Sequence, residues 1–298
     1  MIKGKLSRKT YGLYNFMDYR RVWPKVVYGL FILFMLTVVV VSVLPPISLF
    51  FAGFKNPQDI YSVPFKLLPE SFDFSKIAKV WTDMNFGKYF VNSVIVIAGA
   101  LVCSIVFNGL LAYATAIVKP AGHKVVYSLV LGSMMIPAVL SIVPLFNQIV
   151  KLQLTNKHIA LWLAAGANAY HFVLFHTYFK SLPKSLMEAA RLDGCSKLTL
   201  FYRIVAPLSA PIIGVVAIFT LNATWSDFLL PFLVLKQDAT RTVMVKIFDM
   251  QSNMSTSAQF GMDYLLVVLS ISMIPPIALF IIFQKQITGS VSTSGMKD

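Results

Sequence analysis

Six apolar runs, each long enough to cross a lipid bilayer as a helix, constrain this chain more than any other feature of its sequence. The hydrocarbon core of a bilayer is about 30 Å thick, so a helix needs about 20 apolar residues to cross it. Of the 298 residues, 57% are hydrophobic and only 13% are charged, against about 25% charged in a soluble domain. We therefore predict an all-α, polytopic membrane protein with six transmembrane helices, at residues 26–51, 89–117, 125–149, 158–179, 208–234 and 264–284.

The positions of the basic residues predict how these helices are oriented. Lys and Arg concentrate in the cytoplasmic loops of membrane proteins, and here they are spread between the spans, which argues against a nucleic-acid surface. If the N-terminus is inside, 16 of the 26 Lys and Arg fall in inner segments, which are 1–25, 118–124, 180–207 and 285–298, and the outer segments are 52–88, 150–157 and 235–263. We expect both termini in the cytoplasm and three parts: a basic N-terminal segment (1–25), a transmembrane domain (26–284) and a C-terminal tail (285–298).

Prolines mark the spans that should depart from a straight helix. A proline removes one helical hydrogen bond and clashes with the preceding turn, although neighbouring helices can compensate inside a membrane. We expect a kink at the outer end of the first span, a bent or irregular third span and an interrupted sixth span, because of Pro45–Pro46, of Pro137 with Pro144, and of Pro275–Pro276.

The sequence carries no motif for catalysis or nucleotide binding. It has no G-x-x-x-x-G-K-[S/T] phosphate-binding loop, no paired carboxylates and no Ser/His/Asp spacing. Its four histidines form no metal-binding pattern, and Cys103 and Cys195 fall in an apolar run and a polar loop, respectively. We expect no catalytic residue, no metal and no disulfide.

Polar side chains inside the predicted spans are candidates for a translocation path. Neutral amides and aromatic rings suit uncharged, hydroxyl-rich ligands, although the same groups also hydrogen-bond helices to one another. Asp227 is the one carboxylate clearly within an apolar run, and an ionisable group in a span is a functional candidate by default. A structural role for it stays an alternative. The candidates are Asn168, Asn222, Trp225 and Asp227.

Residues 180–207 form the longest polar interruption in the second half of the chain. Pro183 suits the first turn of a helix, and Ser185 with Glu188 fits a capping box, in which the carboxylate reaches back to a backbone N–H. Gly194 is placed to end that helix in a left-handed turn. We expect two short helices at an angle, a shape suited to a groove on a partner protein.

This stretch resembles the EAA loop of the membrane subunits, or permeases, of ABC importers. In that family EAA is followed by three residues, Gly, nine residues and then I-x-L-P, and here Ala206 stands where Leu is usual. Ser196 can cap the second helix of the loop. We call residues 180–207 the EAA loop. Its expected ATPase-coupling residues are Glu188, Ala189, Ala190, Asp193, Gly194, Ile204 and Pro207.

The resemblance extends through most of residues 170–298. The run WSDFLLP, Trp225–Pro231, is similar to the W-N-x-F-x-x-P segment of sugar-importer permeases, with Ser226 in place of Asn. The C-terminal run QKQITGSVSTSGMKD is similar to the family ending, with Gly289 retained and Asp298 in place of the last Gly. The chain is thus similar to the carbohydrate branch of the family, the branch of the maltose permease G component.

Membership of that branch would imply a multi-subunit importer in the bacterial cytoplasmic membrane. The expected partners are a homologous second permease subunit in a heterodimer, two copies of an ATPase, an extracytoplasmic solute-binding protein, a carbohydrate and membrane lipid. ATP and Mg would be bound by the ATPase, so no cofactor is expected in this chain. Residues 235–263, the last outer loop, would contact the binding protein, and the partner permease would make most of the sugar contacts.

Two other functions compete with an oligosaccharide-import permease. A stand-alone secondary transporter or channel would need more buried charge for coupling than the spans contain, and an intramembrane enzyme would need a catalytic constellation. The substrate stays open between neutral sugars, which the amides favour, and acidic sugars, which the net charge of +14 allows.

Overall fold

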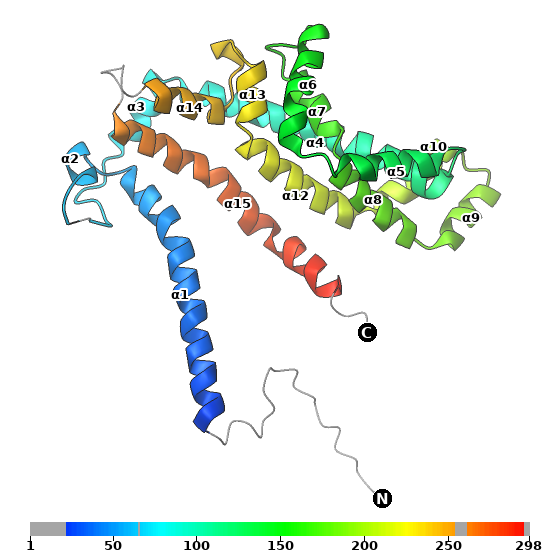
Figure 1. The fold of residues 1–298 in the computed structure, drawn as a ribbon, viewed down its shortest axis with the longest axis horizontal. Coiled ribbons are helices and arrows are strands. Elements are labelled where there is room, and N and C mark those ends of the chain that lie inside the picture. The colour runs from blue at the N-terminus through cyan, green and yellow to red at the C-terminus, as the bar shows by residue number, and fades with distance from the viewer. Residues whose placement is uncertain (1–21, 65, 254–260, 295–298) are drawn as a thin grey trace, which may run out of the picture.

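The computed structural model describes residues 22–64, 66–253 and 261–294, and every regular element in those ranges is a helix. The elements are α1 Val22–Ala52, α2 Pro57–Ile60, α3 Ser75–Asp83, α4 Phe86–Tyr113, η2 Ala114–Val118, α5 His123–Ser133, α6 Ala138–Lys151, α7 Ile159–Gly166, α8 Ala169–Ser181, α9 Lys184–Leu192, α10 Lys197–Leu200, η3 Phe201–Val205, α11 Ala206–Leu208, α12 Ala210–Ser226, α13 Leu229–Val234, η4 Asp238–Thr240, α14 Val243–Asn253 and α15 Met262–Ser294. Figure 1 shows an elongated bundle, with α3 and α14 at one end and α9 and α10 at the other.

Three helices are long and apolar enough to cross a membrane by themselves, at Lys25–Ala52, Phe86–Val118 and Met262–Gln284. Three pairs of helices are long and apolar enough together but are bent at a short break: α5 with α6, by 111°; α7 with α8, by 46°; and the segment Lys197–Leu208 with α12, by 78°. The prediction of an all-helical, membrane-spanning chain is confirmed. The described residues give six crossings where each bent pair counts as one crossing.

Prolines act differently in the three places where we expected them to disturb a span. The third span does break, because helix α5 ends at Ser133 and Pro137 precedes the first residue of α6. Pro144 lies inside α6, and Pro45–Pro46 lie inside α1. The interruption expected at Pro275–Pro276 is wrong: α15 runs through both prolines, since a long apolar helix tolerates the loss of single hydrogen bonds.

The fifth span differs from the predicted 208–234. Helix α12 ends at Ser226, Asp227 has an extended backbone (φ −70°, ψ 124°), and α13 begins at Leu229. Asp227 therefore lies in a break between two helices and not within one. At the other end of α12, Ser209 separates it from α11. Because this run is largely apolar, the sequence predicts one continuous span and does not predict either break.

Helix α4 with its π-helical extension η2 is the central rod of the bundle. It packs against α7, α8, α12 and α14. The contact with α7 is close, because a Cβ atom on Gly99 would lie 2.2 Å from the indole ring of Trp162. At about 1.5 Å per residue, the 33 residues of Phe86–Val118 span about 50 Å. One element thus reaches from one end of the bundle to the other.

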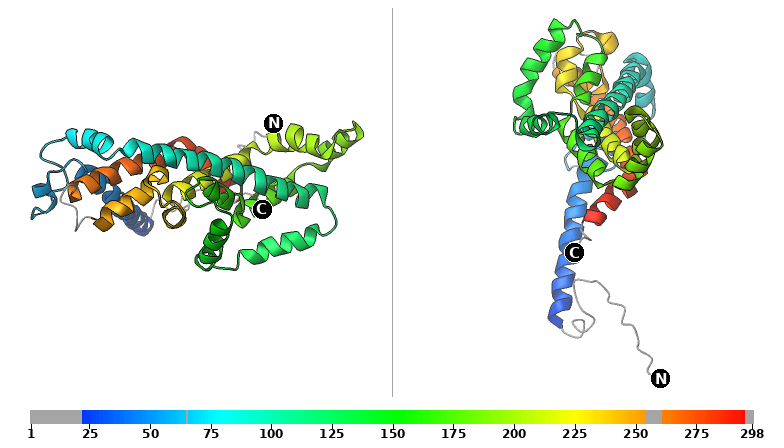
Figure 2. Two further views of the ribbon diagram at one scale, coloured as in Figure 1. Left: turned by 90° about the horizontal axis from the view of Figure 1, so that it is seen from above. Right: turned by 90° about the vertical axis from the view of Figure 1, so that its right-hand side faces the viewer.

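Helix α1 joins the bundle near its C-terminal end and leaves it toward its N-terminus (Figures 1 and 2). Ser270 Oγ of α15 donates a hydrogen bond of 2.8 Å to Leu49 O of α1. Next to this contact, Lys76 of α3 forms a buried ion pair of 3.0 Å with Asp263 and donates to Lys55 O at 2.9 Å. The polar chain that follows α1 is therefore anchored to the first turn of α15.

Hydrogen bonds tie connecting segments together at both ends of the bundle. Asn156 Oδ1, between α6 and α7, accepts a hydrogen bond of 2.6 Å from Lys236 N after α13. At the opposite end, Tyr113 Oη of α4 donates to Lys197 O at 2.8 Å. Which end faces the cytoplasm stays a prediction. Residues 1–21, 254–260 and 295–298, and with them most of the predicted N-terminal segment and part of 235–263, lie outside the described residues.

Candidate functional site

Three regions along α4 contain the residues with a candidate function. The EAA loop lies at its Tyr113 end, a polar cavity lies beside its middle, and a hydrogen-bonded loop, residues 235–249, lies at its Phe86 end. The sequence pointed to the first region in detail, to part of the second, and to the third only as a loop.

The EAA loop contains a sharp left-handed turn at Gly194, where φ is +77°. Gly194 N donates to Arg191 O at 3.1 Å, and Cys195 N donates to Ala190 O at 3.0 Å. These two bonds form the helix-ending arrangement known as the Schellman motif, which favours Gly at the left-handed position. The turn thus sets the angle between α9 and α10.

The caps of the two short helices agree only in part with the sequence analysis. Ser196 does cap α10, because its side chain accepts a hydrogen bond from Thr199 N at 3.2 Å. The capping box is wrong. Pro183 occupies the position before α9 and makes no side-chain cap, so Ser185 lies one residue inside the helix. Proline fits this boundary without a cap, since it favours the start of a helix.

One side of the EAA loop packs against the ends of α4 and α8, and the other side is open. Met187, Ala190, Leu200, Phe201 and Val205 are buried with Tyr113 and Phe175 in one apolar cluster. The opposite side exposes Leu192, at 89% of its surface, and Leu198, at 64%. Of the predicted coupling residues, Ala190 is buried and Ile204 half-buried, while the exposed ones are Glu188, Ala189, Asp193, Gly194 and Pro207.

A buried polar network joins α4, α8 and α12 in the middle of the bundle. Ser104 Oγ lies 2.8 Å from His171 Nδ1 and accepts a hydrogen bond of 3.2 Å from Thr220 Oγ1. Asn168 caps α8, since its Oδ1 accepts from His171 N at 3.0 Å, and Asn168 N donates to Asn108 Oδ1 at 3.2 Å. Buried polar groups of this kind are costly unless they are bonded, and here they bond one another.

A cavity of about 450 Å³ opens beside this network. Its polar lining comes from the start of α8, from α12 and from the break after α12, and the rest of the lining is apolar. Asp227 is one of the lining residues. Its carboxylate accepts hydrogen bonds from the backbone N–H groups of Leu230 and Leu229. The polar lining residues are Asn168, His171, Thr220, Thr224, Ser226 and Asp227.

The structure brings two of the four predicted path residues together. Asn168 and Asp227 both line the cavity. Trp225 is buried elsewhere and donates to Ser272 O at 3.1 Å, and Asn222 is exposed on another side of α12. Thr220 and Thr224 were missed, although their spacing of four residues places them on one helix face.

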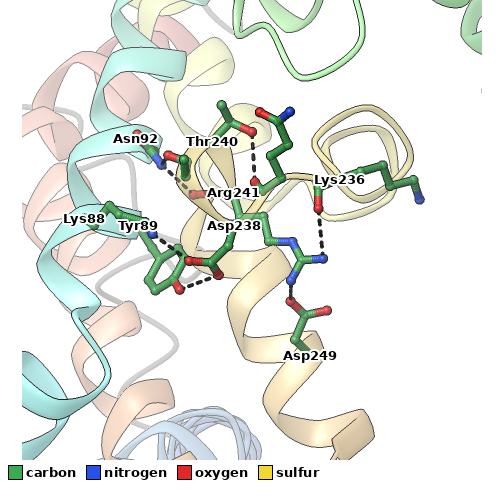
Figure 3. Close-up of polar contacts among 10 residues, drawn as sticks. Lys88, Tyr89, Asn92, Lys236, Asp238, Thr240, Arg241 and Asp249 are labelled. Atoms are coloured by element: carbon green, nitrogen blue, oxygen red, sulfur yellow. Dashed lines mark hydrogen bonds and ion pairs between the residues drawn. The ribbon is translucent and has the colours of Figure 1, made fainter.

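The loop of residues 235–249 is fastened to the Phe86 end of α4 by polar side chains (Figure 3). Asn92 Nδ2 donates to Ala239 O and to Arg241 O, both at 2.9 Å. Asp238 binds Lys88 Nζ at 2.6 Å and Tyr89 Oη at 2.7 Å. Burial opposes ionisation of Asp238, but hydrogen bonds from Lys88 and Tyr89 and nearby positive charges hold the pKa of its carboxyl below the ordinary value.

The same loop has further attachments on its other side. His158 Nε2 lies 2.9 Å from Thr240 O, and within the segment itself Arg241 forms an ion pair with Asp249, near the end of the segment in α14. Asn156 Oδ1 accepts from Lys236 N and, at 2.8 Å, from Gln237 N. Side chains from α4 and from the segment that leads into α7 therefore fix the backbone of this loop, and the Arg241–Asp249 pair links the loop to its own helical part. Within the described ranges, no group of three or more His, Cys, Asp or Glu could hold a metal ion.

Comparisons with known proteins add to this geometry. The family described as "Binding-protein-dependent transport system inner membrane component" matches residues 12–293. The diacetylchitobiose uptake system permease protein NgcG of Streptomyces coelicolor is 33% identical over 85% of this chain and 83% of its own length. The arabinooligosaccharides transport system permease protein AraQ of Halalkalibacterium halodurans is 29% identical over 86% of this chain and 92% of its own. A chain in the crystal structure of a bacterial ABC transporter involved in the import of the acidic polysaccharide alginate has the same fold, with a TM-score of 0.78, 20% identity, and coverage of 92% of this chain and 99% of that chain.

Proposed function

The chain belongs to the family of binding-protein-dependent transport system inner membrane components, and we propose that it forms half of the translocation pathway of an ATP-driven importer of carbohydrates. The observation that carries the proposal is the agreement between this membership and the Gly194 turn, which orients α9 and α10 as one exposed unit. The substrate class is supported by the relatives, whose names specify diacetylchitobiose and arabinooligosaccharides. We infer an oligosaccharide as the transported solute.

The EAA loop is the proposed contact with the cytoplasmic ATPase. Its attachment to the bundle is apolar and its outward side exposes Leu192 and Leu198, so the partner would cover apolar side chains that water now contacts. Two copies of the ATPase, one for each permease subunit, would bind ATP and Mg, and this chain would take no part in hydrolysis.

The opposite end is the proposed contact with an extracytoplasmic solute-binding protein. Residues 235–249 are held by hydrogen bonds from α4 and from the connection between α6 and α7, so they form a firm base for the rest of 235–263. Shortening 251–258, which lies largely outside the described residues, should lower uptake without preventing assembly. Uptake at the wild-type rate would make this segment a simple connector.

The proposed orientation places both termini in the cytoplasm of a bacterial cell, with the chain in the cytoplasmic membrane. It is supported by the excess of Lys and Arg in the inner segments and by the separation of the EAA loop from residues 235–249 along the bundle. A second, homologous permease subunit would complete the pathway.

Reconstitution in proteoliposomes tests the function directly. We expect sugar uptake when the chain is combined with a second permease, the ATPase and a solute-binding protein, and only in the presence of ATP. The purified chain alone should hydrolyse no ATP. Uptake by this chain without any ATPase would instead support the stand-alone transporter, an alternative that neither the family nor the relatives favour.

A further inference from the structure

We propose that this chain builds a carbohydrate subsite of its own in the polar cavity beside α4, and that this subsite accepts neutral sugars and rejects uronates. The juxtaposition that carries the proposal is that of His171 and Asn168 at the start of α8 with Thr224 and Asp227 at the end of α12. The proposal rests on the proposed function, because it places the cavity on the path of the sugar.

His171 is held so that one particular nitrogen is available to the cavity. The ring is buried, and its Nδ1 lies 2.8 Å from Ser104 Oγ. Because Nδ1 is engaged by Ser104, Nε2 is the ring nitrogen left for the cavity that His171 lines. In a neutral imidazole Nε2 donates or accepts according to the tautomer, and a sugar hydroxyl can pair with it in either case.

The neighbouring groups complete a set of alternating donors and acceptors. Asn168 uses its Oδ1 to accept from His171 N, which leaves the amide NH₂ as a donor. The Asp227 carboxylate is an acceptor, and the Thr224 hydroxyl, one turn after Thr220, is both. Each sugar hydroxyl also donates and accepts, so adjacent hydroxyls of one pyranose ring match this set. A volume of about 450 Å³ lies within the range of small-molecule sites.

The charge of the lining decides between sugar classes. Among the lining residues, Asp227 is the one with a formal charge at neutral pH, and Lys and Arg are absent from that set. A uronate would bring a second carboxylate beside Asp227 with no cation among the lining residues, and like charges placed together disfavour binding. A neutral sugar meets no such penalty and can donate a hydroxyl to Asp227.

The decisive experiment measures whether sugar protects an introduced cysteine from labelling by a thiol reagent, in the absence of the solute-binding protein. Ala223 lines the cavity without belonging to the proposed contacts, so Ala223→Cys is introduced into a chain carrying Cys103→Ala and Cys195→Ala. The complex of this chain, the second permease and the ATPase is held with a non-hydrolysable ATP analogue, and the rate at which a small thiol reagent labels the cysteine is measured in the presence of diacetylchitobiose, arabinotriose, raffinose or trigalacturonate. We expect at least one neutral sugar to slow labelling and trigalacturonate to have no effect. Protection by trigalacturonate equal to that by the neutral sugars, or protection by none of the four, overturns the proposal.

Two further variants separate the charge of Asp227 from its structural role. Asp227→Asn keeps an oxygen that can accept from Leu229 and Leu230 but removes the charge, so trigalacturonate should now protect at a concentration at least about tenfold lower. If protection is unchanged, Asp227 only holds α13 and the charge argument fails. Asn222→Cys, on the same helix but outside the cavity, should gain no protection, and equal protection there would put the sugar on the Asn222 side of α12.

Failure of the subsite and failure of the proposed function give different results. If the wild-type importer takes up a neutral sugar of this panel but Ala223→Cys is never protected, only the subsite is wrong. If the assembled importer drives ATP-dependent uptake of none of the sugars, the proposed function fails, and the subsite fails with it.

Discussion

At its Phe86 end, α4 meets residues 235–249 through several side-chain hydrogen bonds in addition to a buried apolar cluster that includes Val243 and Ile247, whereas at its Tyr113 end it meets the EAA loop mainly through apolar contacts. Asn92, Lys88 and Tyr89 bond atoms of the first loop directly. At the other end, Tyr113 Oη makes one bond, to Lys197 O, beside a cluster of buried apolar side chains. Just after the EAA loop, Tyr178 Oη of α8 donates a hydrogen bond of 2.9 Å to Leu208 O.

This difference bears on how each end can move. Hydrogen bonds are directional and weaken steeply when their geometry changes, whereas apolar contact has no preferred direction. We therefore expect residues 235–249 to keep one position on α4. The EAA loop should be able to tilt as one body on its apolar cluster, provided that the Gly194 turn keeps α9 and α10 at a fixed angle.

The largest effect is expected from Gly194→Val, which should abolish uptake without preventing membrane insertion. Gly194 has φ +77° and no neighbouring atom within 4 Å of an added Cβ, so the penalty is backbone strain and not a clash. A left-handed conformation costs a non-glycine residue about 1–2 kcal/mol, and more if it is β-branched. The angle between the two helices would then be lost. ATP-dependent uptake in proteoliposomes, at equal expression, measures the effect.

Gly122→Val is the matched control for that change. Gly122 also has a left-handed backbone, φ +84°, and open space around an added Cβ, but it lies between η2 and α5, outside the EAA loop. It should retain most of its uptake. If both variants lose transport equally, strain in any loop at this end is harmful and the EAA turn has no special role.

The sequence predicted the EAA loop well because its structure is local. The positions of Gly194 and Ser196 follow from backbone chemistry within a few residues, and both are confirmed. The capping box failed because Pro183 and Ser185 compete for the same helix start, and the sequence does not rank them. The links from Asn92 to residues 239 and 241, and from Ser104 to His171, join residues 67 or more apart in sequence, and no local pattern pairs them.

The second prediction concerns the end that is held by hydrogen bonds. Asn92→Ala removes two part-buried hydrogen bonds to backbone carbonyls, each contributing about 0.5–1.5 kcal/mol. The loop should loosen, and the concentration of solute-binding protein that gives half-maximal uptake should rise severalfold while assembly is kept. Titration of the binding protein against uptake in proteoliposomes provides the measurement.

Lys88→Ala sharpens this prediction, because it removes an exposed ion pair from the same loop. The side chains of Lys88 and Asp238 are 32% and 55% exposed, and exposed pairs contribute only about 0.2–1 kcal/mol. The titration should shift less than for Asn92→Ala. A larger shift for Lys88→Ala would mean that charge, and not the Asn92 amide, holds the loop.

The third prediction uses the rate of cysteine labelling to report which side of the membrane each end of the bundle faces. Cys195 is the reporter at the EAA loop, and Cys103, inside α4, is the reference that should not react. Cys195 follows the Gly194 turn and is half-buried, while Cys103 lies in α4. A charged, membrane-impermeant thiol reagent should label Cys195 from the cytoplasmic side only, severalfold more slowly when the ATPase is bound, and should leave Cys103 unlabelled. Inside-out and right-side-out vesicles, stripped or not of ATPase, distinguish these cases. Labelling of Cys195 from outside would reverse the topology.

Gln237→Cys provides the corresponding reporter at the other end. Gln237 is exposed, and its hydrogen bonds to Asn156 and Thr240 use backbone atoms, so the substitution should leave the loop intact. Labelling should occur from outside, should be slowed by the solute-binding protein and should not respond to the ATPase. If Cys195 is equally indifferent to the ATPase, the topology stands but the EAA loop is not the docking surface.

The smallest effect is expected from pH, and it should appear only in residues 235–249. Hydrogen bonds from Lys88 and Tyr89 keep the pKa of Asp238 below its ordinary value despite partial burial. A carboxyl group with a lowered pKa in the folded state contributes stability above its unfolded pKa, about 3.9, and loses it as pH falls through the folded value. Lowering the pH from 7 to 5 should therefore leave the loop unchanged, and loosening should begin only below about pH 4.

Hydrogen exchange of this segment, followed by mass spectrometry, can detect that step. Because Asp238 is more than half exposed, solvent screening keeps its contribution small, and the Asn92 amide, which does not titrate, should still hold the backbone. Asp238→Asn should exchange at one rate, corrected for the intrinsic pH dependence, across the whole range. Two results would contradict this prediction: a transition between pH 7 and 5 in the wild-type chain, or a transition that persists in Asp238→Asn. Either would show that a titratable group other than Asp238 holds this loop and contributes more than the Asn92 amide.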